Sequence, residues 1–182
     1  SGDRFQLSLI PNRDVLYEPY EVSPGVVLAP RAYEFFGSWF EFNSAGHRIW
    51  VLQASYNFGG FYSGTYDELG LGLTMKLNSH VVLEWKTNIV HGRLPEGRFR
   101  QILHRVKADV FLSPRLGLMN YIQYDNITRS LGANVRFRWE FSPGNVIFIV
   151  YNKLWEQRWE PLSRFLPLAD RGVIKIQLNI KP

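Results

Sequence analysis

The sequence predicts an all-β protein, an antiparallel up-and-down transmembrane β-barrel with about ten strands in this chain. Apolar and polar residues alternate with a period of two along most of the 182 residues. Several alternating stretches reach ~10 residues, the length of a membrane-crossing strand, whereas soluble strands average ~5–6 residues. No stretch approaches the ~20 apolar residues of a membrane-spanning helix. Together these observations favour strands that cross a bilayer.

The composition fits one folded domain over residues 1–182. Hydrophobic residues make up 46% of the chain and aromatic residues 15%, which is enough to bury a sizeable apolar surface. Cys is absent, which excludes disulfides, thiolate metal sites and a Cys nucleophile. The net charge is +5, but Lys and Arg are interleaved with Asp and Glu. Because a nucleic-acid interface usually shows clustered basic residues, no nucleic-acid partner is expected.

The expected strands follow one another along the whole chain. Those with the clearest alternation cover 69–77, 102–112, 131–141 and 174–180, each with apolar residues on one face and polar residues on the other. Weaker strands are expected at 5–10, 33–42, 49–58, 81–90, 116–124 and 146–155.

The connections between these strands differ in length. Tight turns, marked by Pro, Gly, Asn or Ser, are expected at 43–47, 78–79, 113–114 and 142–145. Long loops are expected at 11–31, 59–66, 91–97 and 156–170, and a shorter one at 127–130. Short turns at one end and long loops at the other are typical of outer-membrane barrels. The pattern therefore predicts a bacterial outer-membrane location with both termini on the periplasmic side.

The two faces of the strands predict their surroundings. A charge on the lipid face near the membrane centre costs ~2–4 kcal/mol, so the face spared by charge is expected to meet lipid. The residues expected to face lipid are Leu71, Leu73, Val106, Val110, Val135, Phe137, Trp139, Ile176 and Leu178. The residues expected to line the lumen are Glu84, Lys86, Arg105, Lys107, Asp109, Asn134, Arg136, Arg138, Glu140, Lys175 and Gln177. His104 and Asn120 interrupt the apolar face.

Aromatic residues gather toward the strand ends, as in the girdles of membrane barrels, although rim packing in a soluble barrel would give the same pattern. Those near expected tight turns are Trp50, Phe111, Trp139 and Phe141. Those near expected long loops are Tyr56, Phe58, Phe61, Tyr62, Tyr124, Trp155 and Trp159.

Short runs distributed over the chain carry a family resemblance. They are Glu18-Pro19, Gly25-Val26-Val27, Gly59-Gly60-Phe61-Tyr62-Ser63-Gly64, Leu94-Pro95-Glu96-Gly97, Phe111-Leu112-Ser113-Pro114-Arg115-Leu116, Gln123-Tyr124-Asp125, Arg138-Trp139-Glu140, Ser142-Pro143-Gly144-Asn145 and Val150-Tyr151-Asn152. In this order they resemble the C-terminal outer-membrane barrel region of bacterial proteins of unknown function. In that family the barrel follows an N-terminal domain similar to family 9 carbohydrate-binding modules.

The resemblance covers nearly the whole chain and implies an outer-membrane location and a multi-domain parent protein. It supplies no activity and no catalytic residues. The barrel region of the family is longer than this chain, which implies a place as the C-terminal part of a larger barrel. Further barrel strands or another envelope protein are then expected partners, beside membrane lipid.

The functional expectation is a porin-like pore, scaffold or membrane anchor with a charged lumen and no cofactor. One alternative is a soluble β-barrel that binds an apolar ligand inside. Another is an outer-membrane hydrolase that uses carboxylates at the rim, although no residue is assigned as catalytic. The candidate rim carboxylates are Asp67, Glu68, Glu96, Asp125 and Glu156. His47, His80, His91 and His104 lack the spacing of a shared metal site, so no metal is expected.

Overall fold

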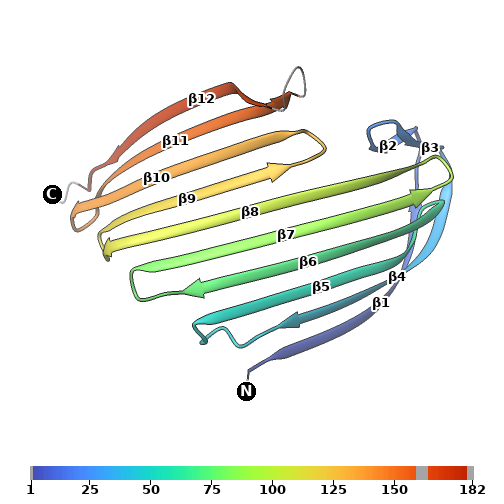
Figure 1. Ribbon diagram of the computed structural model, residues 1–182, viewed down its shortest axis with the longest axis horizontal. Helices are drawn as coiled ribbons and strands as arrows, with labels where there is room; N and C mark the ends of the chain where they lie inside the picture. Colours follow the sequence, from blue (N-terminus) through green and yellow to red (C-terminus); the bar gives the residue numbers. More distant parts are fainter. Residues whose placement is uncertain (1, 159–163, 180–182) are drawn as a thin grey trace. The chain divides into compact units, whose positions relative to one another are not determined.

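The computed structural model describes residues 2–158 and 164–179, and the regular elements of this part are strands (Figure 1). Ten strands form one sheet in the order β1-β4-β5-β6-β7-β8-β9-β10-β11-β12, and β2 and β3 form a separate two-stranded sheet. Apart from the inserted β2–β3 hairpin, neighbours in the sheet are neighbours in the chain. This confirms the expected all-β, antiparallel up-and-down fold with about ten strands.

The strands of the large sheet contain 10 to 17 residues each. They are β1 (Arg4–Val15), β4 (Ala32–Asn43), β5 (Trp50–Phe61), β6 (Gly64–Lys76), β7 (Val81–Leu94), β8 (Gly97–Ser113), β9 (Leu116–Asp125), β10 (Ser130–Ser142), β11 (Asn145–Arg158) and β12 (Arg164–Gln177). The small sheet consists of β2 (Tyr20–Ser23) and β3 (Val26–Leu28). Among the described residues, no helix has the length and hydropathy needed to cross a membrane.

The chain divides into two compact units. Unit 1 contains residues 1–73 and 86–103, and unit 2 contains residues 74–85 and 104–182. Unit 1 therefore holds β1 to β5, and unit 2 holds β9 to β12. Strands β6, β7 and β8 contribute one part to each unit.

The four expected tight turns are confirmed to within two residues, at 44–49, 77–80, 114–115 and 143–144. In the second of them, the side-chain oxygen of Asn78 accepts hydrogen bonds from the backbone N–H groups of His80 and Val81, at 2.8 and 2.9 Å. In the fourth, Gly144 follows a proline and has a φ of 79°. Gly25, between β2 and β3, also follows a proline and has a φ of 78°. A type II turn requires this positive φ after its proline.

Two expected long loops are wrong. The segments 59–66 and 91–97 are strand except for the turns at 62–63 and 95–96. Their glycines weaken the alternation, but here they permit close strand approach, because a Cβ on Gly64 would lie 2.1 Å from the carbonyl oxygen of Arg93. The expected contrast between short turns at one end and long loops at the other is therefore absent at these two connections.

The other two expected long loops are also partly strand. Within 11–31, the first five residues continue β1 and residues 20–28 form the β2–β3 hairpin. Within 156–170, residues 156–158 end β11 and residues 164–170 belong to β12, while 159–163 lie outside the described residues. The shorter connection expected at 127–130 is confirmed, as a link between β9 and β10 at 126–129.

Candidate functional site: the two faces of the sheet

Strand pairing in unit 2 brings predicted lumen residues from different strands onto one face. Arg138 of β10 pairs with Phe148 of β11, and Phe148 pairs with Lys175 of β12. Glu140 and Gln177 are related in the same way through β11. Directly paired residues point to the same face of a sheet. The predicted lumen residues of β10 and β12 therefore share one face, which we call the polar face.

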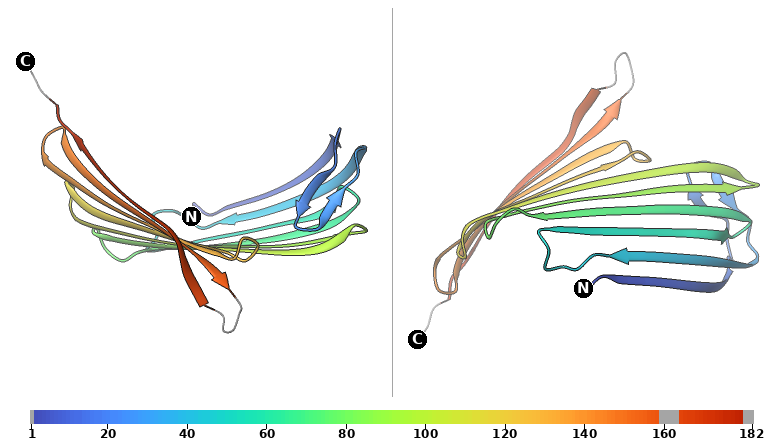
Figure 2. Two further views of the ribbon diagram at one scale, coloured as in Figure 1. Left: turned by 90° about the horizontal axis from the view of Figure 1, so that it is seen from above. Right: turned by 60° about the horizontal axis from the view of Figure 1, so that its bottom comes forward.

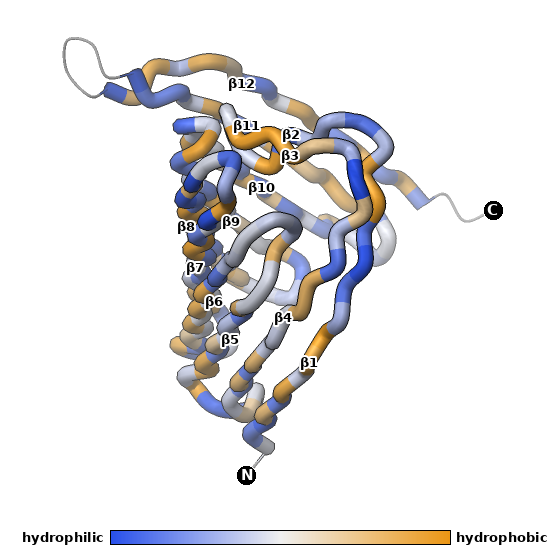
Figure 3. Tube along the Cα trace, turned by 90° about the vertical axis from the view of Figure 1, so that its right-hand side faces the viewer, coloured by the Kyte–Doolittle hydropathy of each residue, from blue (hydrophilic) through white to orange (hydrophobic). Residues whose placement is uncertain are grey.

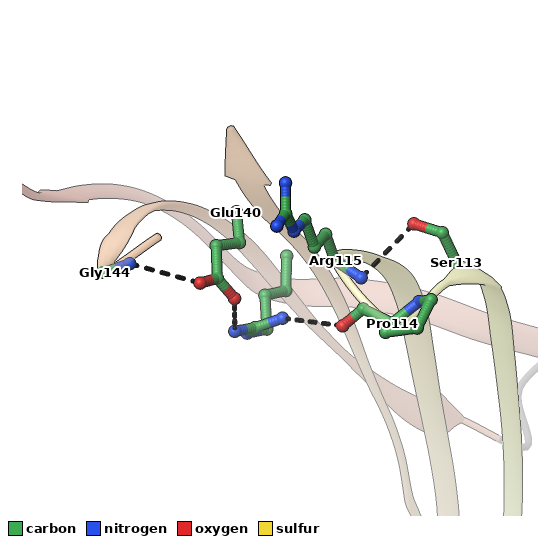
Figure 4. A network of polar contacts seen from close by, with 6 residues as sticks. Ser113, Pro114, Arg115, Glu140 and Gly144 are labelled. Carbon is green, nitrogen blue, oxygen red and sulfur yellow. Dashed lines mark hydrogen bonds and ion pairs between the residues drawn. The ribbon is translucent and has the colours of Figure 1, made fainter. Parts of the chain in front are cut away.

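Ion pairs and hydrogen bonds connect residues of this polar face near the turns of unit 2 (Figure 4). The Arg138 guanidinium lies 2.8 Å from the Glu140 carboxylate and also donates to the Pro114 carbonyl oxygen at 3.5 Å. The Glu140 carboxylate accepts a hydrogen bond from the backbone N–H of Gly144. On β8, Lys107 pairs with Asp109 at 3.1 Å. Opposite charges on this face thus neutralise one another locally.

A shallow groove of about 390 Å³ lies on β9 to β12 of unit 2. Side chains of the polar face that line it carry amide, hydroxyl and guanidinium groups, and they include Tyr121, Gln123, Asn134, Asn152 and Arg171. The Asn134 amide donates to the Asn152 side-chain oxygen, and the Tyr121 hydroxyl donates to Gln123. These groups can exchange hydrogen bonds with water or a polar solute.

In unit 1 the polar face is organised around Glu68 of β6. Its carboxylate accepts hydrogen bonds from the side-chain amides of Asn57 and Asn88 and from the Tyr66 hydroxyl, at 3.1, 2.9 and 3.1 Å. Lys86 lies two residues from Asn88 on β7, so it shares this face. Strands β5, β6 and β7 are thereby linked by charge-assisted hydrogen bonds to one carboxylate.

The β2–β3 hairpin covers part of the polar face in unit 1 (Figure 2), and its apolar residues colour it orange in Figure 3. Val26, Leu28, Tyr33 and Leu94 form a buried cluster, in which Leu28 is 0% exposed. Phe35, Phe61, Tyr62 and Phe99 pack against this cluster. The sequence pattern does not predict this core. Its only local signal was the run Val26-Val27-Leu28 after a Pro-Gly turn.

Three of the expected girdle residues lie on the polar face instead. Phe61 and Tyr62 pack against the hairpin core on the polar face. Phe111 also lies on the polar face, because a Cβ on Gly117 would be 2.8 Å from its ring and Gly117 pairs with Arg138. Trp159 lies outside the described residues.

Tyr62, in the turn between β5 and β6, provides a pH test of the hairpin contact. Burial, followed by the 2.8 Å hydrogen bond that it donates to Asp14, raises the pKa of Tyr62 to about 12. A raised tyrosine pKa contributes stability below the unfolded pKa of ~10, and this contribution is lost as the pH rises through about 12. We therefore expect an ultraviolet titration of Tyr62→Phe to show one tyrosine fewer that ionises near pH 12 than the unchanged protein.

Asp14→Asn is the matched variant for this titration. It removes the charge and weakens the hydrogen bond but keeps the burial, so the pKa should fall only part of the way toward its ordinary value. A Tyr62 that titrates near pH 10 in the unchanged protein would contradict the packing described for the hairpin.

The opposite, apolar face of unit 1 is strongly exposed. Phe5 pairs with Phe42 and Leu7 with Phe40, and Phe5 and Leu7 are each 69% exposed. The exposed apolar residues on this face of β1, β4 and β5 include Phe5, Leu7, Leu9, Phe36, Phe40, Leu52, Tyr56 and Phe58. The apolar run ends at Arg13, which lies 3.7 Å from Glu34 of β4.

The apolar face of unit 2 carries aromatic residues toward both ends of its strands. Trp139 and Phe141 pack together beside the turn at 143–144, with ring centroids 6.0 Å apart. Toward the other end, Tyr124 packs edge-on against Phe165 at 6.2 Å and donates to Gln157. Between these levels, Val135 pairs with Tyr151, and Ile149 pairs with Phe137 on one side and with Ile174 on the other.

The two polar interruptions of this face have partners. The Asn120 side-chain amide donates to the carbonyl oxygen of Ala108 at 3.1 Å. His104 stacks on Tyr124, with ring centroids 6.5 Å apart. Both residues are therefore accommodated by contacts with a neighbouring strand.

Alternation assigns the remaining predicted residues to faces. Glu84, Arg105, Lys107 and Asp109 alternate with apolar neighbours on β7 and β8, and Asn134 and Arg136 lie on the polar face of β10 with Arg138. The predicted lipid-facing residues lie on the opposite faces of their strands; they are Leu71, Leu73, Val106, Val110, Val135, Phe137, Trp139 and Ile176. Leu178 follows β12 and is 61% exposed. Which face meets lipid stays a prediction.

The candidate rim carboxylates have separate partners. Asp67 pairs with His91 at 3.1 Å, whereas the adjacent Glu68 points to the polar face. A hydrogen bond from the Ser63 hydroxyl is the main cause that lowers the pKa of Glu96. Asp125 accepts from the backbone N–H of Ile127, and Glu156 pairs with Arg158. Among residues 2–158 and 164–179, no group of three or more His, Asp or Glu residues could hold a metal.

Comparison with known proteins adds no relative, because no family model, no curated protein and no solved structure matches this chain. The family resemblance given by the sequence motifs therefore stays an expectation.

Proposed function

We propose that this chain forms a transmembrane β-barrel of the bacterial outer membrane and acts as a scaffold or anchor with a polar, ion-paired lumen. The observation that carries this proposal is the division of the strands into one exposed apolar face and one polar face. In a soluble protein, exposed apolar surface of this extent would be a site of aggregation. In a bilayer it is the surface that contacts acyl chains.

The dimensions of the apolar stretch fit this environment. From Phe5 to Arg13, β1 rises ~27 Å at ~3.4 Å per residue, or ~20 Å across a membrane at a tilt of ~40°. This is close to the ~25 Å height of the apolar band of membrane barrels. The Arg13–Glu34 ion pair marks the point where charge becomes acceptable.

Membrane insertion also requires partners for the sheet edges. β1 and β12 are first and last in the strand order, so each has one neighbour in the sheet. Unpaired backbone groups are costly in hydrocarbon, and only closed barrels avoid them. We infer that the free edges of β1 and β12 pair with one another or with further strands of a longer parent barrel.

A scaffold or anchor is favoured over an open pore because of the β2–β3 hairpin. The hairpin buries an apolar cluster on the polar face of unit 1. A barrel of about ten strands is already narrow, since wide aqueous channels need ~16 strands. The pore is the second candidate, and the 390 Å³ groove of unit 2, with its polar side chains, is the observation in its favour.

Insertion into vesicles tests the proposal. We expect the refolded chain to float with phosphatidylcholine vesicles, to resist extraction at high salt, and to aggregate when the detergent is removed without lipid. A chain that stays monodisperse in buffer would instead support a soluble barrel with the apolar face inside. Single-channel recording of the inserted protein then separates the scaffold, with no stable conductance, from the pore.

A further inference from the structure

We propose that the guanidinium groups of Arg93, Arg98 and Arg100, on the apolar face of unit 1, bind the phosphate of a lipid headgroup. The inference rests on the proposed membrane location and extends it by naming a lipid chemistry and a binding surface. The three arginines lie at the edge of unit 1 that carries the turns at 62–63 and 95–96, which we call the hairpin edge.

Strand alternation places these arginines on the apolar side of the sheet. Phe99, between Arg98 and Arg100, packs into the hairpin core on the polar face, so its two neighbours point the other way. On β7, a Cβ on Gly92 would meet the Phe99 ring at 2.1 Å, which puts Gly92 on the polar face. Arg93 next to it consequently points toward the same side as Arg98 and Arg100.

The basic groups surround a pocket. A cavity of about 290 Å³ is lined by His91, Arg93, Arg98, Arg100 and the residues between them. The Arg93 side chain is 64% exposed, and Arg98 and Arg100 are also exposed. Asp67 lies 3.1 Å from His91 and 3.6 Å from Arg93. Three guanidinium groups from two neighbouring strands thus line one cavity.

The position of this pocket selects a lipid rather than a free anion. Further along the same faces of β6, β7 and β8 come Leu69, Ile89 and Ile102, where acyl chains would lie. Leu69 is 38% exposed. A headgroup phosphate is attached to such chains, so both parts of the molecule would find a matching surface. Arginine is suited to this role because its planar fork binds phosphate oxygens in pairs.

The test compares lipid binding by the full chain with that of two variants, all in zwitterionic detergent micelles. The probe is short-chain phosphatidic acid, and inorganic phosphate is the competing free anion. We expect the double variant Arg98→Ala, Arg100→Ala to bind the probe roughly 30-fold more weakly, from ~1 kcal/mol per arginine. Arg13→Ala is the matched control, because Arg13 is an exposed arginine paired with Glu34 on the same face.

Each possible result of this experiment either supports or overturns the headgroup site. Equal affinity of the double variant and the unchanged protein for the probe in micelles, with both chains able to insert into vesicles in a separate assay, would overturn the headgroup site and leave the membrane location intact. Inorganic phosphate that displaces the probe at equal concentration would also overturn it, because the acyl chains would then contribute nothing. Failure of the unchanged protein to insert would refute the membrane location and the headgroup site together. Weaker binding by the double variant alone, with normal insertion, supports the proposal.

Discussion

Replacing Val135 with arginine should abolish stable insertion of the protein into membranes. Val135 lies near the middle of β10 on the apolar face, where it pairs with Tyr151 on one side and Asn120 on the other. An arginine near the membrane centre costs ~2–4 kcal/mol. This lowers the ratio of inserted to unfolded protein by roughly 30- to 700-fold. The measurement is the fraction of protein that resists protease after refolding into phosphatidylcholine vesicles.

The matched control is Asn134→Arg, one residue away on the polar face. Asn134 lines the groove of about 390 Å³ in unit 2, which has room for a longer side chain and access to polar groups. The variant loses the amide hydrogen bond to Asn152, a neutral bond worth ~1 kcal/mol. Insertion should therefore stay close to that of the unchanged protein. If the two arginines impaired insertion equally, the proposed assignment of faces to lipid and lumen would be incorrect.

The fold class could be predicted because alternation is a local property of the sequence. Along β10, the residues from Leu131 to Phe141 alternate between apolar and polar character, and this alternation can be seen without knowing which strands pair with β10. Alternation fixes the face of a residue but not the residue opposite it. The register shift between Leu154 and Trp155, where β11 meets β12, has no counterpart in the sequence pattern. Pairing depends on contacts between strands and was not predictable.

The errors at the connections have a common physical origin. The sequence pattern places Gly59, Gly60 and Gly92 in loops, but they are strand residues at which a neighbouring strand or ring approaches closely. Phe99 fills the space beside Gly92, for example. The expected loop at 91–97 covers the end of β7 and the first residue of β8. The sequence pattern therefore gives no strand pairing there that would place Arg93 and Arg98 on one surface. The alternation of Arg98, Phe99 and Arg100 was the signal that could have found them.

The hairpin core was missed because its members come from distant parts of the chain. Leu28 belongs to β3, while Tyr33, Leu94 and the surrounding aromatic residues come from β4 to β8. A single apolar triplet within an expected loop predicts no buried core by itself. Only the folding of segment 16–31 onto the polar face brings these residues together. This contact therefore provides a test of structure that the alternation pattern could not supply.

Leu28→Ala should destabilise the protein and release the hairpin. Leu28 is fully buried, and truncation of a buried leucine to alanine typically costs ~2–5 kcal/mol. In the described part of the chain the small β2–β3 sheet has no third strand, and packing against residues such as Tyr33 and Leu94 holds it on the large sheet. We expect a loss of that size in the free energy of unfolding of the micelle-bound chain, measured with urea. Protease cleavage between residues 16 and 31 should become faster.

Val27→Ala is the control for this variant, because Val27 lies in the same strand but is 46% exposed. It should change the free energy of unfolding by less than about 1 kcal/mol, since little burial is lost. Equal destabilisation by the two variants would refute the packing of the hairpin on the polar face. If the hairpin also blocks the lumen, Leu28→Ala should show transient conductance in single-channel recordings while Val27→Ala does not. If Leu28→Ala shows no conductance although its hairpin is cleaved rapidly, then paired side chains, rather than the hairpin, close the lumen.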